Sequence, residues 1–159
     1  MAKATHNGIC QICGSEQAVN PKTGLIAAHG YAVMYHQQHN KCHGGKQLPL
    51  QVETELARQY VDFLQDEIES YQDELEQGVD EVAISVPVPG TRIFQTKMVG
   101  REEWEAQNQQ IGWRWENAVE CRRKDLVRWT ALNEHWIDGI EERINRYHGD
   151  ALIPRKVAA

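Results

Sequence analysis

Two cysteines three positions apart restrict what the first fifty residues of this chain can fold into. Cys10 and Cys13 lie in the stretch GICQICG, and a third cysteine, Cys42, follows in HNKCHGGK. A structural zinc ion takes four tetrahedral nitrogen or sulfur ligands, and two of them commonly come from a tight Cys-x-x-Cys turn. The spacing therefore predicts half of a metal site at Cys10 and Cys13, with the other half farther along the chain.

The remaining ligands must come from the cysteine and the histidines downstream. Cys42 is favoured because a thiolate binds zinc well and because Gly44 and Gly45 permit a tight turn behind it. His29 is favoured because the following glycine places a turn directly behind the imidazole, although three other histidines remain alternatives: His36, His39 and His43. We expect a structural Zn²⁺ site of three thiolates and one imidazole, with a net charge of about −1. The predicted ligands are Cys10, Cys13, His29 and Cys42.

The composition of the chain bounds the classes of protein to which it can belong. At 159 residues it is long enough for one domain, and 41% hydrophobic with 25% charged residues is ordinary for a globular protein. No apolar run approaches the roughly 20 residues of a membrane span. The opening MAKATHNG also lacks the apolar segment of a secretory signal. We therefore expect a cytoplasmic protein with no membrane partner, whose cysteines do not form a disulfide framework.

The formal charge of −6 is distributed unevenly along the chain. Residues 1–50 carry four lysines and one glutamate, whereas residues 51–78 carry nine acidic residues and one arginine. An acidic stretch on a helix is usually a solvated face, but it can also imitate nucleic-acid phosphates towards a basic partner. The basic and the acidic segments are therefore two separate candidate interaction surfaces.

The pattern of apolar residues predicts a mainly α fold with a small head. Residues 1–48 have no helical period and are interpreted as a zinc-stapled head. Apolar residues then recur every three or four positions over 49–77 and again over 101–148, which predicts two helices. Between them, the β-branched stretch 79–99 predicts a short β-hairpin-like tip. The expected domains are the head, 1–48, an antiparallel αα-hairpin (coiled coil), 49–149, and a C-terminal tail, 150–159.

The tryptophans favour one continuous second helix. At about 100° per residue, four of them fall on one face of a helix over 101–148. These are Trp104, Trp115, Trp129 and Trp136. Their face is expected to pack against the first helix and, near its end, against the head. Trp113 falls on the other side, where it either lies over aliphatic side chains or anchors a partner.

The order of these motifs resembles that of a group of uncharacterised small proteins of tailed phages and related mobile elements. The shared features are CQICG, HGY and CHGG, followed by a long helical hairpin with a β-like tip. The resemblance implies a zinc-stapled head on a coiled-coil hairpin and a function inside a bacterial host cell. It implies no enzymatic activity.

A second likeness is to HNH endonucleases, which often place a zinc turn before a strand that ends in a catalytic histidine. In that interpretation His29 activates water and His43 helps to hold a catalytic divalent ion. Two departures count against it. Ala28 stands where a metal-binding acid usually precedes the histidine, and Cys42 stands alone where a second Cys-x-x-Cys is common. We therefore expect that the protein is not an enzyme.

Two non-catalytic functions follow from these features. The first is a phage accessory factor that binds and inhibits or redirects a host or phage protein. Its candidate partner-binding residues are Trp113, Asp62, Asp66, Glu69, Asp73 and Glu76. The alternative is a zinc-finger protein that binds nucleic acid through Lys22, Lys41 and Lys46. The sequence leaves open the identity of the partner, homodimer formation and whether the acidic face is used or merely solvated.

Overall fold

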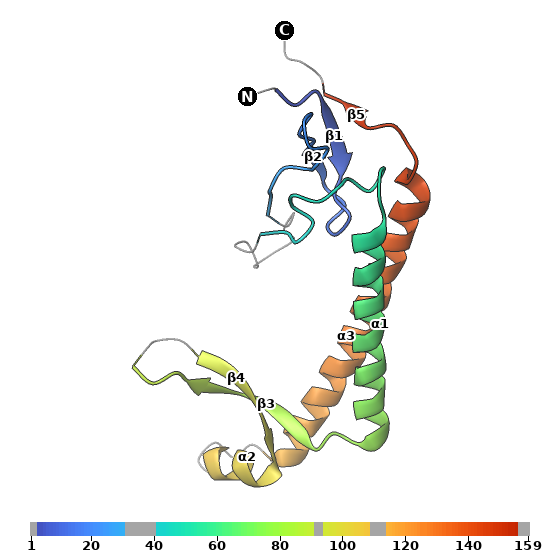
Figure 1. Ribbon diagram of the computed structural model, residues 1–159. Coiled ribbons are helices and arrows are strands. Elements are labelled where there is room, and N and C mark those ends of the chain that lie inside the picture. The colour runs from blue at the N-terminus through green and yellow to red at the C-terminus, as the bar shows by residue number, and fades with distance from the viewer. Residues whose placement is uncertain (1–2, 31–40, 91–93, 109–113, 156–159) are drawn as a thin grey trace. The chain divides into compact units, whose positions relative to one another are not determined.

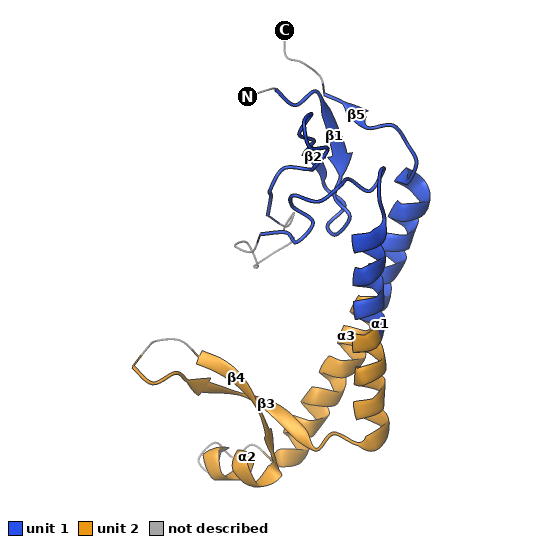
Figure 2. Cartoon of the chain, viewed as in Figure 1, with its two compact units in different colours: residues 1–65, 134–159 blue, residues 66–133 orange. Residues whose placement is uncertain are grey.

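The computed structural model describes residues 3–30, 41–90, 94–108 and 114–155. The elements in chain order are β1 (His6–Ile9), β2 (Glu16–Ala18), α1 (Glu55–Gln77), β3 (Glu81–Pro87), β4 (Phe94–Gly100), α2 (Arg101–Asn108), α3 (Trp115–Tyr147) and β5 (Ile153–Pro154) (Figure 1). They form two compact units, residues 1–65 with 134–159 and residues 66–133 (Figure 2). The helices α1 and α3 each contribute one part to each unit.

The prediction of a mainly α fold, an αα-hairpin of coiled-coil type, is wrong. Of the described residues, 47% are helical and 20% are in strands. The strands form a three-stranded sheet of order β2-β1-β5 and a two-stranded sheet of order β3-β4. Counting apolar periods detects an amphipathic helix whatever it packs against, and it gives little weight to strands of two to four residues. The strand content was therefore underestimated.

In the first unit, β1 is the central strand of an antiparallel sheet. Ile9 pairs with Glu16 of β2, while Asn7 pairs with both Ala18 of β2 and Ile153 of β5. The chain between β1 and β2 contains the Cys-x-x-Cys motif, so the two cysteines lie at one end of this strand pair. The segment expected to be a tail after residue 149 thus supplies a strand to the sheet of the N-terminal segment.

One cluster of buried residues in this unit includes two of the predicted metal ligands. Its buried members are Cys10, Ile12, Val19, Ile26 and Cys42. Half-buried side chains that pack against it come from α1 and from the chain after α3; they are Leu56, Tyr60 and Leu152. Other apolar residues of the same unit are also buried: Ile9, Leu50, Ala57, Val61, Leu64, Ile137 and Ile140.

Helix α1 begins at Glu55, whereas the sequence pattern predicted a start at Pro49. Pro49 and Leu50 are buried against the sheet, and the Leu50 amide donates a hydrogen bond to the Ile9 carbonyl over 2.8 Å. Pro49 and Leu50, which were expected to form the first turn of the helix, therefore belong to the core of the N-terminal segment. Thr54 immediately precedes the helix, and its carbonyl accepts the Arg58 amide over 2.9 Å.

The helix predicted over 101–148 is two helices in the structure. The hairpin β3–β4 runs antiparallel from the pair Glu81 and Gly100 to the pair Pro87 and Phe94, and α2 follows directly after β4. Helix α2 ends at Asn108 and α3 begins at Trp115, with residues 109–113 outside the described ranges. One cluster of buried residues in the second unit consists of Val82, Val99, Trp104 and Ala118. This core joins the hairpin to the starts of both helices.

The four tryptophans do not form one seam, because the helix that was expected to align them is interrupted. Trp104 and Trp115 lie on different helices with their rings 5.9 Å apart, edge to face, in the core of the second unit. Trp129 is 36% exposed and Trp136 is 43% exposed, so neither is a core residue. Tyr71 of α1 covers Trp129 with a ring separation of 5.8 Å.

Candidate metal centre

The structure brings the side chains of the four predicted ligands together. The Sγ atoms of Cys10, Cys13 and Cys42 and one ring nitrogen of His29 all lie within 4.8 Å of one another. Cys10 and Cys42 are buried, whereas Cys13 and His29 are half-buried at the edge of the core. Three sulfurs and one nitrogen at these short distances from one another form a candidate metal centre.

The first two ligands lie on a tight turn that begins where β1 ends. The Gly14 amide donates to the Cys10 carbonyl over 3.0 Å, and the Cys10 amide donates to the Ser15 carbonyl over 2.9 Å. Gly14 has a φ of +69°, which a residue with a β-carbon adopts at a cost. The glycine after Cys13 therefore lets the chain reverse within the turn and enter β2 with both sulfurs on the same side.

The other two ligands are held beside each other by a backbone contact. The Cys42 amide donates to the His29 carbonyl over 2.9 Å, next to a bridge that pairs Gly30 with Lys41. Gly44 then passes directly over the first turn, since a β-carbon at this position would lie 2.3 Å from the Cys10 sulfur. Only a glycine allows this close approach, which brings the second turn onto the first.

The imidazole of His29 is oriented by its own backbone. Its Nδ1 lies 2.9 Å from the Ala27 carbonyl, which can only accept a hydrogen bond, so Nδ1 carries the proton. The Nε2 lone pair therefore points at the Cys13 sulfur, 3.3 Å away. A partner on the far nitrogen that fixes the tautomer is a common companion of metal-binding histidines.

The cluster distributes its protons unevenly. A hydrogen bond from the Cys10 thiol lowers the pKa of Cys13 to about 4, and the Ser15 hydroxyl, 2.9 Å from the sulfur, adds to this effect. The same bond raises the pKa of Cys10, and burial raises it further. Burial also raises the pKa of Cys42. These shifts favour the thiolate form at Cys13, whose sulfur faces the Nε2 nitrogen of His29.

The spacing of these atoms fits a tetrahedral ion with sulfur and nitrogen ligands. Two thiolates bound to one zinc ion at about 2.3 Å in tetrahedral geometry have sulfurs about 3.8 Å apart. The Sγ atoms of Cys10 and Cys42 are 3.7 Å apart. The lone pairs of Cys13 and His29 converge on the same space, where a cation would satisfy both. All four coordination positions would be filled by the protein, as in structural zinc sites.

The other residues proposed from the sequence lie outside this cluster where they fall within the described ranges. His43 is exposed and not part of it, and His36, His39 and Trp113 fall outside the described residues. The nucleic-acid candidates Lys22, Lys41 and Lys46 are all exposed. Lys46 has a φ of 65° and lines a shallow pocket of about 490 Å³ with small and aliphatic residues. The partner-binding candidates Asp62, Asp66, Glu69, Asp73 and Glu76 are exposed on α1.

Gln11 and Arg143 were not among the predicted site residues, but both help to hold the first turn. Gln11, between the cysteines, is completely buried; its Nε2 donates to the Leu48 carbonyl over 2.9 Å and its Oε1 accepts the Ala57 amide over 3.1 Å. Arg143 of α3 donates to the Ile12 carbonyl over 3.5 Å. A polar residue inside a metal-binding turn was a usable signal for Gln11, whereas no local pattern points to Arg143.

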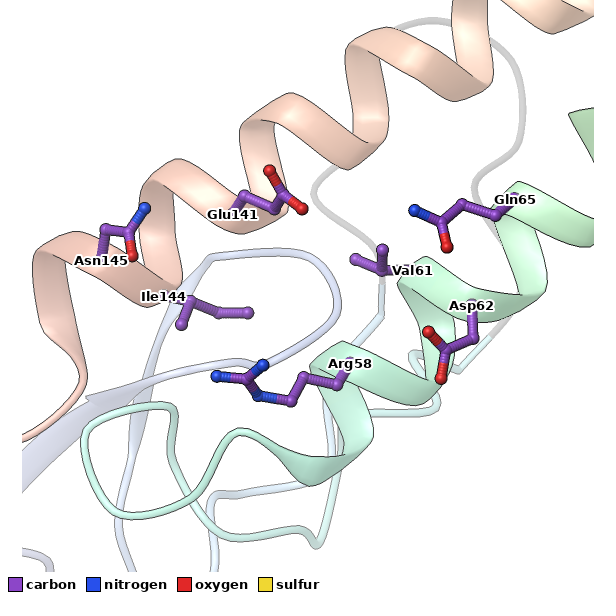
Figure 3. A pocket seen from close by; sticks show the side chains of 7 residues that line it. All are labelled: Arg58, Val61, Asp62, Gln65, Glu141, Ile144 and Asn145. Carbon is purple, nitrogen blue, oxygen red and sulfur yellow. The ribbon is translucent and has the colours of Figure 1, made fainter.

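A groove also lies between the two helices of the first unit, with a volume of about 600 Å³. Figure 3 shows side chains from α1 and α3 around it: Arg58, Val61, Asp62, Gln65, Glu141, Ile144 and Asn145. Carboxylates, amides, one guanidinium and two aliphatic groups are mixed along its walls. This is the composition of an exposed cleft between two amphipathic helices, and it selects no ligand class.

Comparisons with known proteins add no identification. No protein-family model, no curated protein and no solved structure matches the chain. Within the described residues, no helix combines the length and the apolar character needed to cross a membrane. Conclusions about function therefore depend on the geometry of the cluster and on the surfaces around it.

Proposed function

We propose that this protein is a non-enzymatic binding protein whose N-terminal unit is held together by a structural zinc ion. The observation that carries the proposal is the convergence of three sulfurs and one imidazole nitrogen within 4.8 Å. Zinc is the proposed metal because a mixed thiolate and imidazole set without carboxylates suits it. With four protein ligands, the ion has no open position for water or substrate.

A structural role also matches the energetic need of the unit. Two of the buried side chains in the cluster around Ile12 are the thiols of Cys10 and Cys42, and within the described residues the segment before α1 contributes only the short strands β1 and β2. Metal ligation supplies on the order of 10 kcal/mol to small domains that cannot fold on apolar burial alone. The ligands come from two separated segments, so one ion would close both the turn at Cys10 and the loop that ends at Cys42.

The arrangement of His29 supports the non-enzymatic interpretation over an HNH-type nuclease. A general base needs a free nitrogen within reach of a water molecule. Here Nδ1 bonds to the Ala27 carbonyl and Nε2 faces the Cys13 sulfur. His43, which would hold the catalytic ion in the nuclease, is not part of the cluster.

The surface proposed for binding is the acidic face of α1. In the second unit, Asp66, Glu69, Asp73 and Glu76 follow one another at steps of three and four and fall within about 80° around the helix. All four are exposed. A row of carboxylates fits a basic groove on another protein, as phosphates would. Given the likeness in layout to phage proteins, the proposed partner is a basic protein of a bacterial host or phage.

The metal part of the proposal is tested with cysteine variants. We expect purified wild-type protein to contain one zinc ion per chain, and its cobalt-substituted form to show intense thiolate-to-metal absorption. Cys42→Ser should lose the zinc ion and the cobalt absorption. Cys121→Ser should keep both, because Cys121 is exposed and lies on α3 outside the cluster. Equal metal content in the two variants contradicts the assignment.

The binding part is tested with a charge-neutralised α1. The variant D66N/E69Q/D73N/E76Q should lose a stoichiometric host partner that wild type retains at moderate salt, and a matched variant E102Q/E103Q on α2 should retain it. Loss of the partner in neither variant contradicts the proposed surface. A salt-sensitive shift of DNA or RNA that disappears when Lys22, Lys41 and Lys46 are neutralised would instead support the nucleic-acid alternative.

A further inference from the structure

The side chain of Arg143 lies against the backbone of the first metal-binding turn. A β-carbon at Gly14 would be 2.7 Å from its Cδ and 2.9 Å from its Nε, so only glycine leaves space for it. One guanidinium nitrogen, Nη2, donates to the Ile12 carbonyl over 3.5 Å. The arginine therefore crosses over three consecutive residues of the turn, one of which is the ligand Cys13.

The charge of this arginine is not compensated in the usual way. Its Nε is buried and has no hydrogen-bond partner, and the side chain is half-buried. Among the described residues, no carboxylate forms an ion pair with it. Partial burial of an unpaired charge is costly, and proteins normally place an opposite charge nearby.

The metal centre is the nearby source of negative charge. Three thiolates and a neutral imidazole around a divalent zinc ion carry about one negative charge. The guanidinium contacts the Ile12 carbonyl and lies against Gly14, on either side of Cys13, so its charge and its hydrogen bond act on the turn that holds two candidate ligands. Groups that orient and balance the ligands in this way commonly change metal affinity by about 10- to 100-fold.

We infer that Arg143 is a positioning residue of the metal centre, which compensates the charge of the thiolate cluster and fixes the Cys10–Gly14 turn from helix α3. This inference rests on the proposed structural zinc. It makes metal affinity depend on a residue far from all four ligands in the sequence. It also means that the end of α3 and the metal site stabilise each other.

The test compares zinc dissociation constants by competition with a chromophoric chelator. Arg143→Met keeps a long stem over Gly14 but removes the charge and the donors, and we expect a 10- to 100-fold weaker zinc affinity. Arg143→Lys keeps the charge, so its affinity should fall between those of wild type and R143M. Arg146→Met removes the same charge one turn away, where the guanidinium lies over Tyr147, and should stay within about 2-fold of wild type.

The comparison of Gly14→Ala with Gly24→Ala needs no substitution at Arg143 and keeps the inference testable if R143M does not fold, and a double-mutant cycle tests the contact between Gly14 and Arg143. Gly14→Ala should weaken zinc binding in the wild-type background, since its β-carbon collides with Arg143, and it should cost less in an R143A background. Gly24→Ala is the matched control, because Gly24 also has a positive φ of 73° but meets no atom closer than 3.6 Å. Equal zinc affinities for wild type and R143M, or an equal cost of G14A in both backgrounds, would overturn the inference.

These results separate the two proposals. If wild type binds no zinc, the proposed structural site fails before any Arg143 variant is considered. If wild type binds zinc and R143M binds it equally well, the site stands and only the role of Arg143 fails.

Discussion

Gly44 and Cys10 are in contact across the metal centre, so closely that a β-carbon at position 44 would lie 2.3 Å from the Cys10 sulfur. This contact joins the two halves of the site. The first turn ends β1, whereas Gly44 follows Cys42 on the second segment. The glycine is therefore part of the site although it supplies no ligand.

Gly44→Ala should disrupt the centre. The new methyl group overlaps the Cys10 sulfur, so either the sulfur or the second turn must move and the tetrahedral arrangement is lost. We expect sub-stoichiometric zinc and a weakened thiolate-to-cobalt band. Gly100→Ala is the control, since a β-carbon there would meet nothing closer than 3.9 Å. Full metal content in G44A would show that the close approach is not required.

Gln11→Leu should destabilise the protein by about 2–4 kcal/mol, because it leaves the Ala57 amide and the Leu48 carbonyl without partners in a buried place. The measurement is urea unfolding with metal present. Gln72→Leu, on the exposed face of α1, should change the free energy of unfolding by less than about 0.5 kcal/mol. Similar effects of the two substitutions would mean that Gln11 does not anchor the start of α1.

Arg122 and Glu74 should be coupled more strongly than an ordinary surface pair. The guanidinium donates twice to the carboxylate, over 2.9 and 2.7 Å, and lies 5.1 Å from the centre of the Trp129 ring. A double-mutant cycle with R122M and E74Q should give a coupling energy of about 1–2 kcal/mol, above the range for exposed pairs. The exposed pair Lys124 and Glu120 should give less than about 0.5 kcal/mol. Equal coupling energies for the two pairs would show that Arg122 and Glu74 interact no more strongly than an exposed pair.

The Tyr71 hydroxyl should lose its proton at a higher pH than an ordinary tyrosine. Burial raises its pKa to about 12, and its hydroxyl, which donates to the Glu67 carboxylate over 2.5 Å, adds to the shift. Because the unfolded tyrosine has a pKa near 10, the folded state keeps its proton longer, and the stability from this group is lost as pH rises from about 10 to 12. In an absorbance titration at alkaline pH, the difference between wild type and Tyr71→Phe should show a tyrosine with a pKa of about 12. A difference that titrates near the ordinary tyrosine pKa of about 10 would contradict the shift.

The members of the candidate metal centre could be chosen from the sequence because metal chemistry imposes short, specific spacings. Cys10, Cys13 and Cys42 are the cysteines of the N-terminal segment, and the turn after His29 separated it from the other histidines. Gln11 and Arg143 could not be chosen in this way. Their roles depend on which helix ends reach the turn, and that is decided by tertiary packing.

The fold was harder to predict for the same reason. The apolar period of 101–148 is compatible with one helix, but Trp104 and Trp115 face each other across a break and share a core with a β-hairpin. Similarly, Leu50 falls within the helix predicted over 49–77, yet it precedes α1 and is buried beside β1. Periodicity reports that a face is apolar and does not report what covers it.

The central claim is that one zinc ion, held by three sulfurs and one imidazole, organises the N-terminal unit. Elemental analysis of the folded protein, purified under reducing conditions without added metal, tests it most directly. We expect one zinc ion per chain. A folded protein with essentially no bound metal would contradict it.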